Sequence, residues 1–199
     1  MNNGDARTEI MRSIRSHLAL SAPYESREPR TNTDPCKSVS PSVVSSVVAE
    51  FKRNLEAVDG HCIIARNKLE VEAAVTRITE GKRIASSDAP PSVQDLFNCD
   101  VGITWAQAGI AETGTLMLDS AAEQNRLVSL VPPVHIAILD ASRIYATLGE
   151  TLAMLQSGDE ISPAITFITG PSRTADIELT LTVGVHGPQE LHVIIIERN

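Results

Sequence analysis

The N-terminal part of the chain contains one amphipathic pattern followed by a long polar stretch. Apolar side chains recur at helical spacing within residues 1–20, which predicts a helix. These side chains are Ile10, Met11, Ile14 and Leu18. Residues 21–40 are rich in proline, serine, threonine and charge and offer almost nothing to bury, so we expect a flexible linker there. The helix is expected to pack either on the main domain or on another subunit.

The main domain is expected to span residues 41–199. Ser40 and Pro41 form a strong helix start, because serine is a favoured N-cap and proline suits the first helical position. An apolar face at helical spacing follows, and Gly60 is expected to end this helix. Asn67 and Glu70 have the spacing of a capping box, which predicts a second helix to residue 79.

Short apolar runs alternate with helical patterns through the rest of the domain. The runs cover residues 61–65, 82–86, 101–105, 114–118, 127–131, 134–139, 164–169 and 191–196. Ser142 is expected to cap a further helix that reaches residue 155. The last run does not alternate in polarity, as expected of a strand covered on both faces. The pattern predicts an α/β fold, a three-layer αβα arrangement with a mostly parallel sheet.

Residues 164–197 predict a βαβ unit with a polar turn after its first strand. Ligands commonly bind outside the carboxyl ends of parallel strands. Ser172 or Thr174 is expected to cap a short helix over 177–181, whose free amides would hold an anion together with Arg173. Asp176 is also explained as a carboxylate that suits the positive end of that helix. The candidate anion-binding residues of this region are Gly170, Ser172, Arg173, Thr174, Asp176, His186 and Gly187.

A second candidate cluster surrounds Glu112. Thr113, Gly114 and Thr115 follow it between two apolar runs. A partly buried carboxylate there would have a raised pKa and could act as base or nucleophile. The alternative is a turn glutamate that accepts hydrogen bonds from backbone amides.

A third cluster pairs Arg126 with His135 on either side of Pro132 and Pro133. Two prolines enforce an extended corner, which could direct both side chains toward one opening. Arg126 suits a carboxylate or a phosphate. The alternative, and the more common role for a histidine just before an apolar run, is a structural histidine.

The motifs of several enzyme classes are missing. A Ser172–His186–Asp176 triad is conceivable, but no Gly-x-Ser-x-Gly elbow occurs. The glycine-rich nucleotide motifs are absent as well, and the histidines are too isolated to predict a metal site. No cofactor is therefore expected in this chain.

Charge and cysteine content narrow the expected partners and location. The 199 residues carry a formal net charge of -8, which argues against nucleic-acid binding and docking on anionic membranes. No stretch approaches the roughly 20 apolar residues of a spanning helix, so no membrane insertion is expected. No signal peptide is visible, and the three cysteines form no Cys-x-x-Cys pair, so we expect reduced thiols in a cytoplasmic protein.

Four motifs, in order, resemble the lactate-utilisation protein C family and its LUD domain. They are Ala111-Glu-Thr-Gly-Thr115, Pro132-Pro-Val-His-Ile136, Ile168-Thr-Gly-Pro-Ser-Arg-Thr-Ala-Asp-Ile-Glu178 and Gly184-Val-His-Gly-Pro188. The resemblance covers about residues 41–197 and implies a fold similar to the NagB, ribose-5-phosphate isomerase and CoA-transferase group. It also implies a role in oxidising L-lactate to pyruvate beside two partner proteins that carry iron–sulfur clusters.

Three functions remain open on this basis. The first is an accessory subunit that binds a small anion of the carboxylate or phosphate type. The second is a stand-alone enzyme of the CoA-transferase or sugar-phosphate type, since CoA transferases of similar fold use a glutamate in a Glu-x-Gly setting, like Glu112-Thr-Gly114; this argument is one of fold analogy. The third is a non-catalytic assembly protein that docks through its N-terminal helix.

Overall fold

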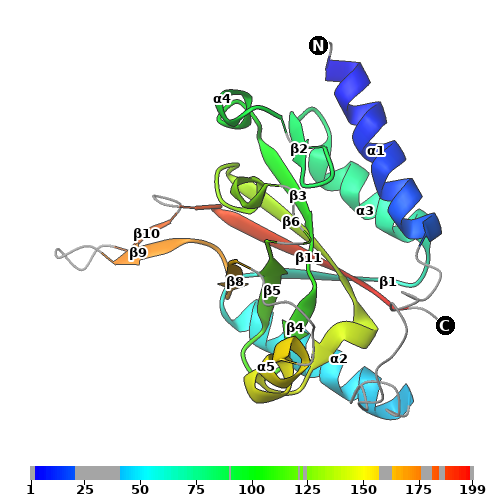
Figure 1. The fold of residues 1–199 in the computed structure, drawn as a ribbon, viewed down its shortest axis with the longest axis vertical. Coiled ribbons are helices and arrows are strands. Elements are labelled where there is room, and N and C mark those ends of the chain that lie inside the picture. Colours follow the sequence, from blue (N-terminus) through cyan, green and yellow to red (C-terminus); the bar gives the residue numbers. More distant parts are fainter. Residues whose placement is uncertain are drawn as a thin grey trace.

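A five-stranded parallel sheet forms the centre of the protein (Figure 1). Its strands, in spatial order, are β1 (His61–Ala65), β11 (Glu190–Ile196), β6 (Val134–Asp140), β3 (Val101–Trp105) and β2 (Ile84–Ser86). This computed structural model describes residues 3–20, 41–89, 91–120, 122, 125–156, 163–175, 181–183 and 187–197. The predicted linker over residues 21–40 lies outside the described residues.

The two central strands are buried on both faces. Ile194 of β11 lies opposite Ile138 of β6, and Val193 lies opposite Ala137, so alternate residues supply the two sides of the core. Strands covered on both faces read as continuous apolar runs rather than alternating ones. The predicted burial of the last strand is confirmed.

One face of the sheet is covered by α1 (Asn3–Leu20) and α3 (Lys68–Thr79). Ile10 and Ile14 of α1 are buried in a cluster with Val71 and Val75 of α3 and with alternate strand residues. At the surface, the Arg15 guanidinium pairs with Glu72 at 3.1 Å. The N-terminal helix therefore packs on its own domain.

The predicted capping box at the start of α3 is confirmed. The Asn67 side chain accepts a hydrogen bond from the Glu70 amide at 3.0 Å. The Glu70 carboxylate in turn accepts from the Arg66 amide at 2.8 Å. The first bond satisfies a backbone donor of the first helical turn, and the second holds the residue before the N-cap.

The other face carries α2 (Pro41–Ala57) and a second, four-stranded sheet. The order of that sheet is β7 (Ile144–Tyr145), β4 (Ala108–Ile110), β5 (Thr115–Asp119) and β8 (Ile165–Ile168). Phe51 and Leu55 of α2 are fully buried between the two sheets, together with Leu139. The α/β fold with a mostly parallel sheet is confirmed, and the second sheet is an addition that the sequence did not indicate.

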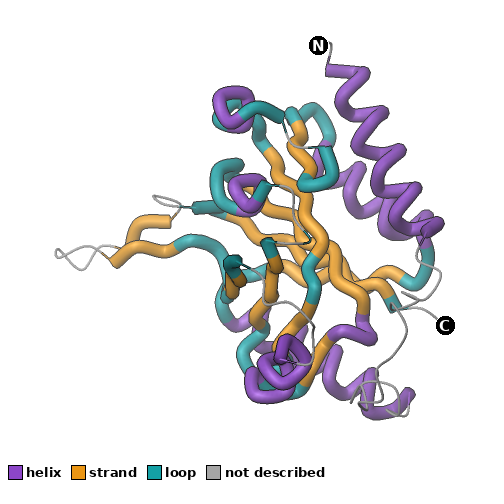
Figure 2. Tube along the Cα trace, viewed as in Figure 1, coloured by secondary structure: helices purple, strands orange, loops and turns teal. Residues whose placement is uncertain are grey.

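The predicted βαβ unit over residues 164–197 is wrong. β8 pairs antiparallel with β5 in the second sheet, whereas β11 lies in the parallel sheet. The intervening chain forms an antiparallel ribbon of β9 (Arg173–Ala175) and β10 (Leu181–Val183), which projects from the body (Figures 1 and 2). The predicted helix over 177–181 lies outside the described residues except for Leu181, which begins β10.

Two other segments differ from the sequence prediction. The apolar run over 127–131 is largely the 3₁₀ turn η2 (Arg126–Ser129) rather than a strand. The helix predicted from Ser142 starts later: η3 (Ala141–Arg143) and β7 precede α5 (Leu148–Gln156), which packs on the outer side of the second sheet. Short apolar runs do not by themselves distinguish these alternatives.

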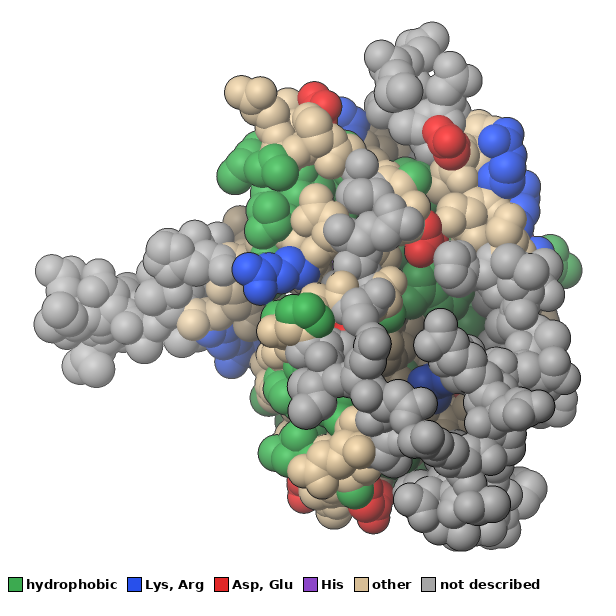
Figure 3. All heavy atoms as spheres, in the orientation of Figure 1, with side chains coloured by type: hydrophobic (Ala, Val, Ile, Leu, Met, Phe, Trp, Pro, Cys, Tyr) green, Lys and Arg blue, Asp and Glu red, His purple; other side chains and the backbone are tan. Residues whose placement is uncertain are grey.

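Exposed hydrophobic side chains lie on α4 (Val93–Leu96) and directly after it, at the upper left of Figure 3. Val93 is 53% and Phe97 72% exposed there. None of the described helices is long and apolar enough to cross a membrane.

Candidate ligand-binding cleft

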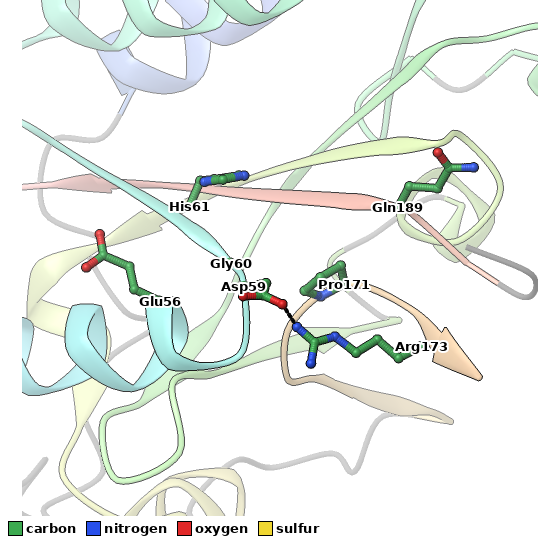
Figure 4. A pocket seen from close by; sticks show the side chains of 7 residues that line it. All are labelled: Glu56, Asp59, Gly60, His61, Pro171, Arg173 and Gln189. Carbon is green, nitrogen blue, oxygen red and sulfur yellow. Dashed lines mark ion pairs between the residues drawn. The ribbon is translucent and has the colours of Figure 1, made fainter. Parts of the chain in front are cut away.

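An open cleft of about 490 Å³ lies at the amino edge of the parallel sheet (Figure 4). One wall is the end of α2 and the start of β1, and the other is the turn that leads into β9. The lining residues are Glu56, Asp59, Gly60, His61, Pro171, Arg173 and Gln189. Ligands were expected to bind at the carboxyl edge, which is the opposite edge of the sheet. That expectation placed β8 in the parallel sheet, whereas β8 belongs to the second sheet.

The first wall is a tight turn that follows α2. The Gly60 amide donates to the Leu55 carbonyl at 3.0 Å, and a Cβ on Gly60 would lie 2.5 Å from Leu55 Cδ1. Between them Asp59 adopts a left-handed backbone with φ 62°, a conformation that aspartate tolerates better than most residues. The turn presents the Asp59 carboxylate, whose side chain is 76% exposed, to the cleft.

The second wall is fixed against the first by close backbone contact. Gly170 has φ 82°, and a Cβ there would lie 2.8 Å from the carbonyl oxygen of Val58. This contact brings the Arg173 guanidinium into an ion pair with Asp59 (Figure 4). The Arg173 side chain remains 35% exposed, so it can contact both the carboxylate and the cleft.

Ser172 connects this wall to the segment before β11. Its amide donates to the Pro188 carbonyl at 2.8 Å, and a Cβ on Gly187 would lie 3.0 Å from Ser172 Cβ. The chain continues from Ser172 into a strand, so the prediction that Ser172 or Thr174 caps a helix is wrong. The same packing places Gln189 on the cleft lining.

One lining residue of the cleft, His61, stacks on the imidazole of His192, which is not on the lining. His61 and His192 are register partners on β1 and β11, and their ring centroids lie 4.8 Å apart at 26°. His192 Nε2 lies 3.2 Å from Glu190 Oε2. Burial lowers the pKa of His192, and the hydrogen bond with Glu190 partly opposes that shift.

Glu112 lies in a turn that packs on α2 and faces the start of α5. Its Oε1 accepts a hydrogen bond from the Leu148 amide at 2.7 Å, which satisfies a free donor of the helix. Thr115 Oγ1 lies 2.7 Å from the hydroxyls of both Thr113 and Thr169. These contacts match the turn-glutamate interpretation, and they leave the carboxylate outside the cleft lining.

Replacing Glu112 is therefore expected to affect stability. Glu112→Ala should lower the free energy of unfolding by about 1 kcal/mol, as typical for loss of a helix cap. Glu112→Gln should cost less, because its amide oxygen can still accept from Leu148 and only the charge is lost. Urea unfolding measures both values, and unchanged hydrogen exchange of the Leu148 amide in Glu112→Ala would contradict the assignment.

Arg126 and His135 are not brought together in the cleft. Arg126 is exposed on η2. His135 is only 1% exposed, and its Nε2 lies 2.8 Å from Thr104 Oγ1. Its Nδ1 has no hydrogen-bond partner among the described residues. Burial lowers the pKa of His135 to about 3, so the ring is neutral at physiological pH.

The remaining candidates are only partly described. Asp176 and His186 lie outside the described residues, as does the side chain of Thr174. Among the described residues, no group of three or more His, Cys, Asp or Glu side chains could hold a metal ion. Burial raises the pKa of the Cys62 thiol to about 12, which makes it a poor nucleophile or ligand.

Four polar lining residues of the cleft were not predicted from the sequence: Glu56, Asp59, His61 and Gln189. Asp59-Gly60 is a common turn dipeptide, so a turn could have been predicted there. Nothing in the local pattern connects it to Arg173, because that contact depends on how the second sheet packs on α2.

This chain spans about half the length of several known proteins that it resembles. Lactate utilization protein C of Bacillus licheniformis is 36% identical over 125 residues, which are 59% of this chain and 52% of that protein. Lactate utilization protein C of Anoxybacillus flavithermus is 25% identical over 204 residues and aligns with 96% of this chain and 92% of its own length.

A solved structure and a family match agree with the architecture. The crystal structure of a DUF162 family protein from Deinococcus radiodurans has a TM-score of 0.60 at 22% identity, covering 77% of this chain and 98% of that chain. It supports the fold. The family model of the LUD domain matches residues 92–196, more than half of the chain and including Pro171, Arg173 and Gln189 of the cleft. The chain therefore belongs to the LUD domain family.

Proposed function

We propose that this protein is a cytoplasmic subunit of an L-lactate utilisation system and that it holds a small carboxylate in the cleft beside Arg173. Relatives named lactate utilization protein C support the system. The observation that carries the ligand is Arg173, the one lysine or arginine among the described residues that line the cleft.

The charge of the cleft selects the kind of anion. A guanidinium can bind a carboxylate through two parallel hydrogen bonds. Gln189 and His61 line the same cleft and can add hydrogen bonds to a ligand. Glu56 and Asp59 also line it, and their negative charge disfavours ligands that carry several negative charges. A monocarboxylate such as lactate or pyruvate suits this balance better than a phosphosugar or a CoA ester.

In this proposal, partner proteins with iron–sulfur clusters carry out the oxidation of lactate itself. This chain would bind and present the carboxylate, and the partners would carry the electrons. The exposed Val93 of α4 and Phe97 at its end support association with another protein, since interfaces commonly cover such side chains.

Loss of Arg173 should abolish most of the binding. Arg173→Gln is expected to weaken binding of pyruvate and L-lactate by roughly tenfold to a hundredfold, because hydrogen bonds to charged groups contribute about 1.5–3 kcal/mol. Isothermal titration calorimetry measures this loss directly. Arg77→Gln, on the exposed side of α3, is the matched control and should bind as the unaltered protein does.

The proposal fails if Arg173→Gln binds both acids as well as the unaltered protein. The CoA-transferase or sugar-phosphate alternative gives a different result. Acetyl-CoA or a phosphosugar would then raise the melting temperature of the unaltered protein, and Glu112→Gln would lose turnover. The hydrogen bond from Leu148 to Glu112 favours the binding role over a nucleophilic one.

A further inference from the structure

We infer that Asp59 is an internal competitor for the ligand at Arg173 and sets the preference of the cleft for singly charged carboxylates. This inference rests on the proposed carboxylate site. In the structure the Arg173 guanidinium is paired with Asp59, a carboxylate supplied by the chain itself. A ligand carboxylate must therefore displace Asp59 or share the guanidinium with it.

The pair is held in place by the backbone of both walls. Asp59 is fixed in its left-handed turn by the hydrogen bonds from its own amide to Glu56 and from Gly60 to Leu55. Gly170, which lies shortly before Arg173, packs closely against the carbonyl of Val58. Val58 is the residue before Asp59. The backbone of the two walls thus holds the two charged groups opposite each other.

The pair is weak enough to be opened by a ligand. Both side chains are partly exposed, Asp59 more than Arg173, so water screens their attraction. Ion pairs of this kind contribute little, and a ligand carboxylate with ideal two-point geometry can replace Asp59 at modest cost.

Displacement leaves the Asp59 carboxylate at the edge of the cleft, where it acts on charge selection. A monocarboxylate places its one negative charge on Arg173 and its uncharged end elsewhere. A dicarboxylate brings a second negative charge close to Asp59 and Glu56, which line the same wall. Asp59 therefore lowers the affinity for both ligands, and lowers it more for the doubly charged one.

Asp59→Asn tests this role with little change of shape. Asparagine has the size of aspartate and also tolerates the left-handed backbone that φ 62° requires. Titration calorimetry with pyruvate and with malonate compares the unaltered protein, Asp59→Asn, Arg173→Gln and the double variant. Glu80→Gln, an exposed carboxylate at the end of α3, is the control for a general change in net charge.

The expected result is a gain of affinity. Asp59→Asn should bind pyruvate about two- to fivefold more tightly, the range that an exposed ion pair allows. Its gain for malonate should be larger, so the ratio of the two dissociation constants should fall toward one. The double variant should bind pyruvate no more tightly than Arg173→Gln does, because Asp59 competes with a monocarboxylate only for Arg173. Glu80→Gln should bind both acids as the unaltered protein does.

The outcomes separate this inference from the proposed function. Pyruvate binding that depends on Arg173 but is unchanged or weaker in Asp59→Asn would overturn the competitor role and leave the carboxylate site intact. An equal gain in Glu80→Gln would also overturn it, because the effect would then be one of net charge. Pyruvate binding unaffected by Arg173→Gln would refute the carboxylate site, and the inference with it.

Discussion

Gly114→Ala is expected to lower the free energy of unfolding by about 3 kcal/mol, the sum of a steric clash and backbone strain. A Cβ at this position would lie 2.2 Å from the Leu55 amide nitrogen and 2.6 Å from Leu55 Cα. These are backbone atoms of Leu55, a buried residue of α2, and they cannot move aside as a flexible side chain can. The left-handed backbone of Gly114, with φ 65°, adds strain for any residue with a Cβ.

Gly81→Ala is the matched control. Gly81 has φ 70°, but a Cβ there would meet nothing within 4 Å. This variant should cost only the backbone strain, about 1 kcal/mol. Urea unfolding of the two variants separates strain from clash. Equal losses would show that the Glu112 turn does not press on α2 as described.

Acidification is expected to destabilise the protein through His135. Burial lowers the pKa of this histidine to about 3 in the folded state, whereas an unfolded histidine has a pKa of about 6.5. As the pH falls below about 6.5, the unfolded chain gains a proton that the folded protein does not. The contribution of His135 to stability is therefore fully present above about pH 6.5. Below that pH the free energy of unfolding falls by about 1.4 kcal/mol per pH unit toward pH 3.

His135→Gln is the variant that tests this contribution. Glutamine can place a polar group near the position of Nε2 and keep a hydrogen bond to Thr104, but it does not titrate. Urea unfolding at several pH values should show a shallower acid slope in the variant, by roughly one proton. The NMR signals of the His135 ring should also stay constant from pH 8 to pH 5. A ring titration near pH 6.5 would contradict the buried, neutral histidine.

Local sequence signals predicted most of the elements of the parallel sheet. The capping box at Asn67 and Glu70 predicts α3 because its hydrogen bonds lie within four residues of each other. The uninterrupted apolar run of β11 likewise predicts burial on both faces, since that pattern needs no knowledge of the neighbours.

The partners of a strand were harder to predict than its existence. An apolar run such as residues 164–169 fits a parallel or an antiparallel sheet equally well, so the position of β8 in a second sheet did not follow from its pattern. This error moved the expected site from the amino to the carboxyl edge of the parallel sheet.

The candidate site was predictable only in part for the same reason. Arg173 was identified because anion-binding residues cluster around it in the sequence. Its partner Asp59 was not, because the two meet only when Gly170 packs on the end of α2. His135 was expected at an opening, but the sequence carries no sign of η2 packing over the neighbouring strand, where a Cβ on Gly102 would lie 1.9 Å from the Val128 carbonyl oxygen.

The position of β11 has a consequence for how the chain folds during synthesis. β11 lies between β1 and β6, yet it is made after every other strand of the sheet. Until residues 190–196 leave the ribosome, β1 has no neighbouring strand in this sheet, and β6 is paired only with β3. In the nascent chain the facing edges of β1 and β6 therefore stay unpaired until the last strand is made, and unpaired strand edges are prone to associate with other chains.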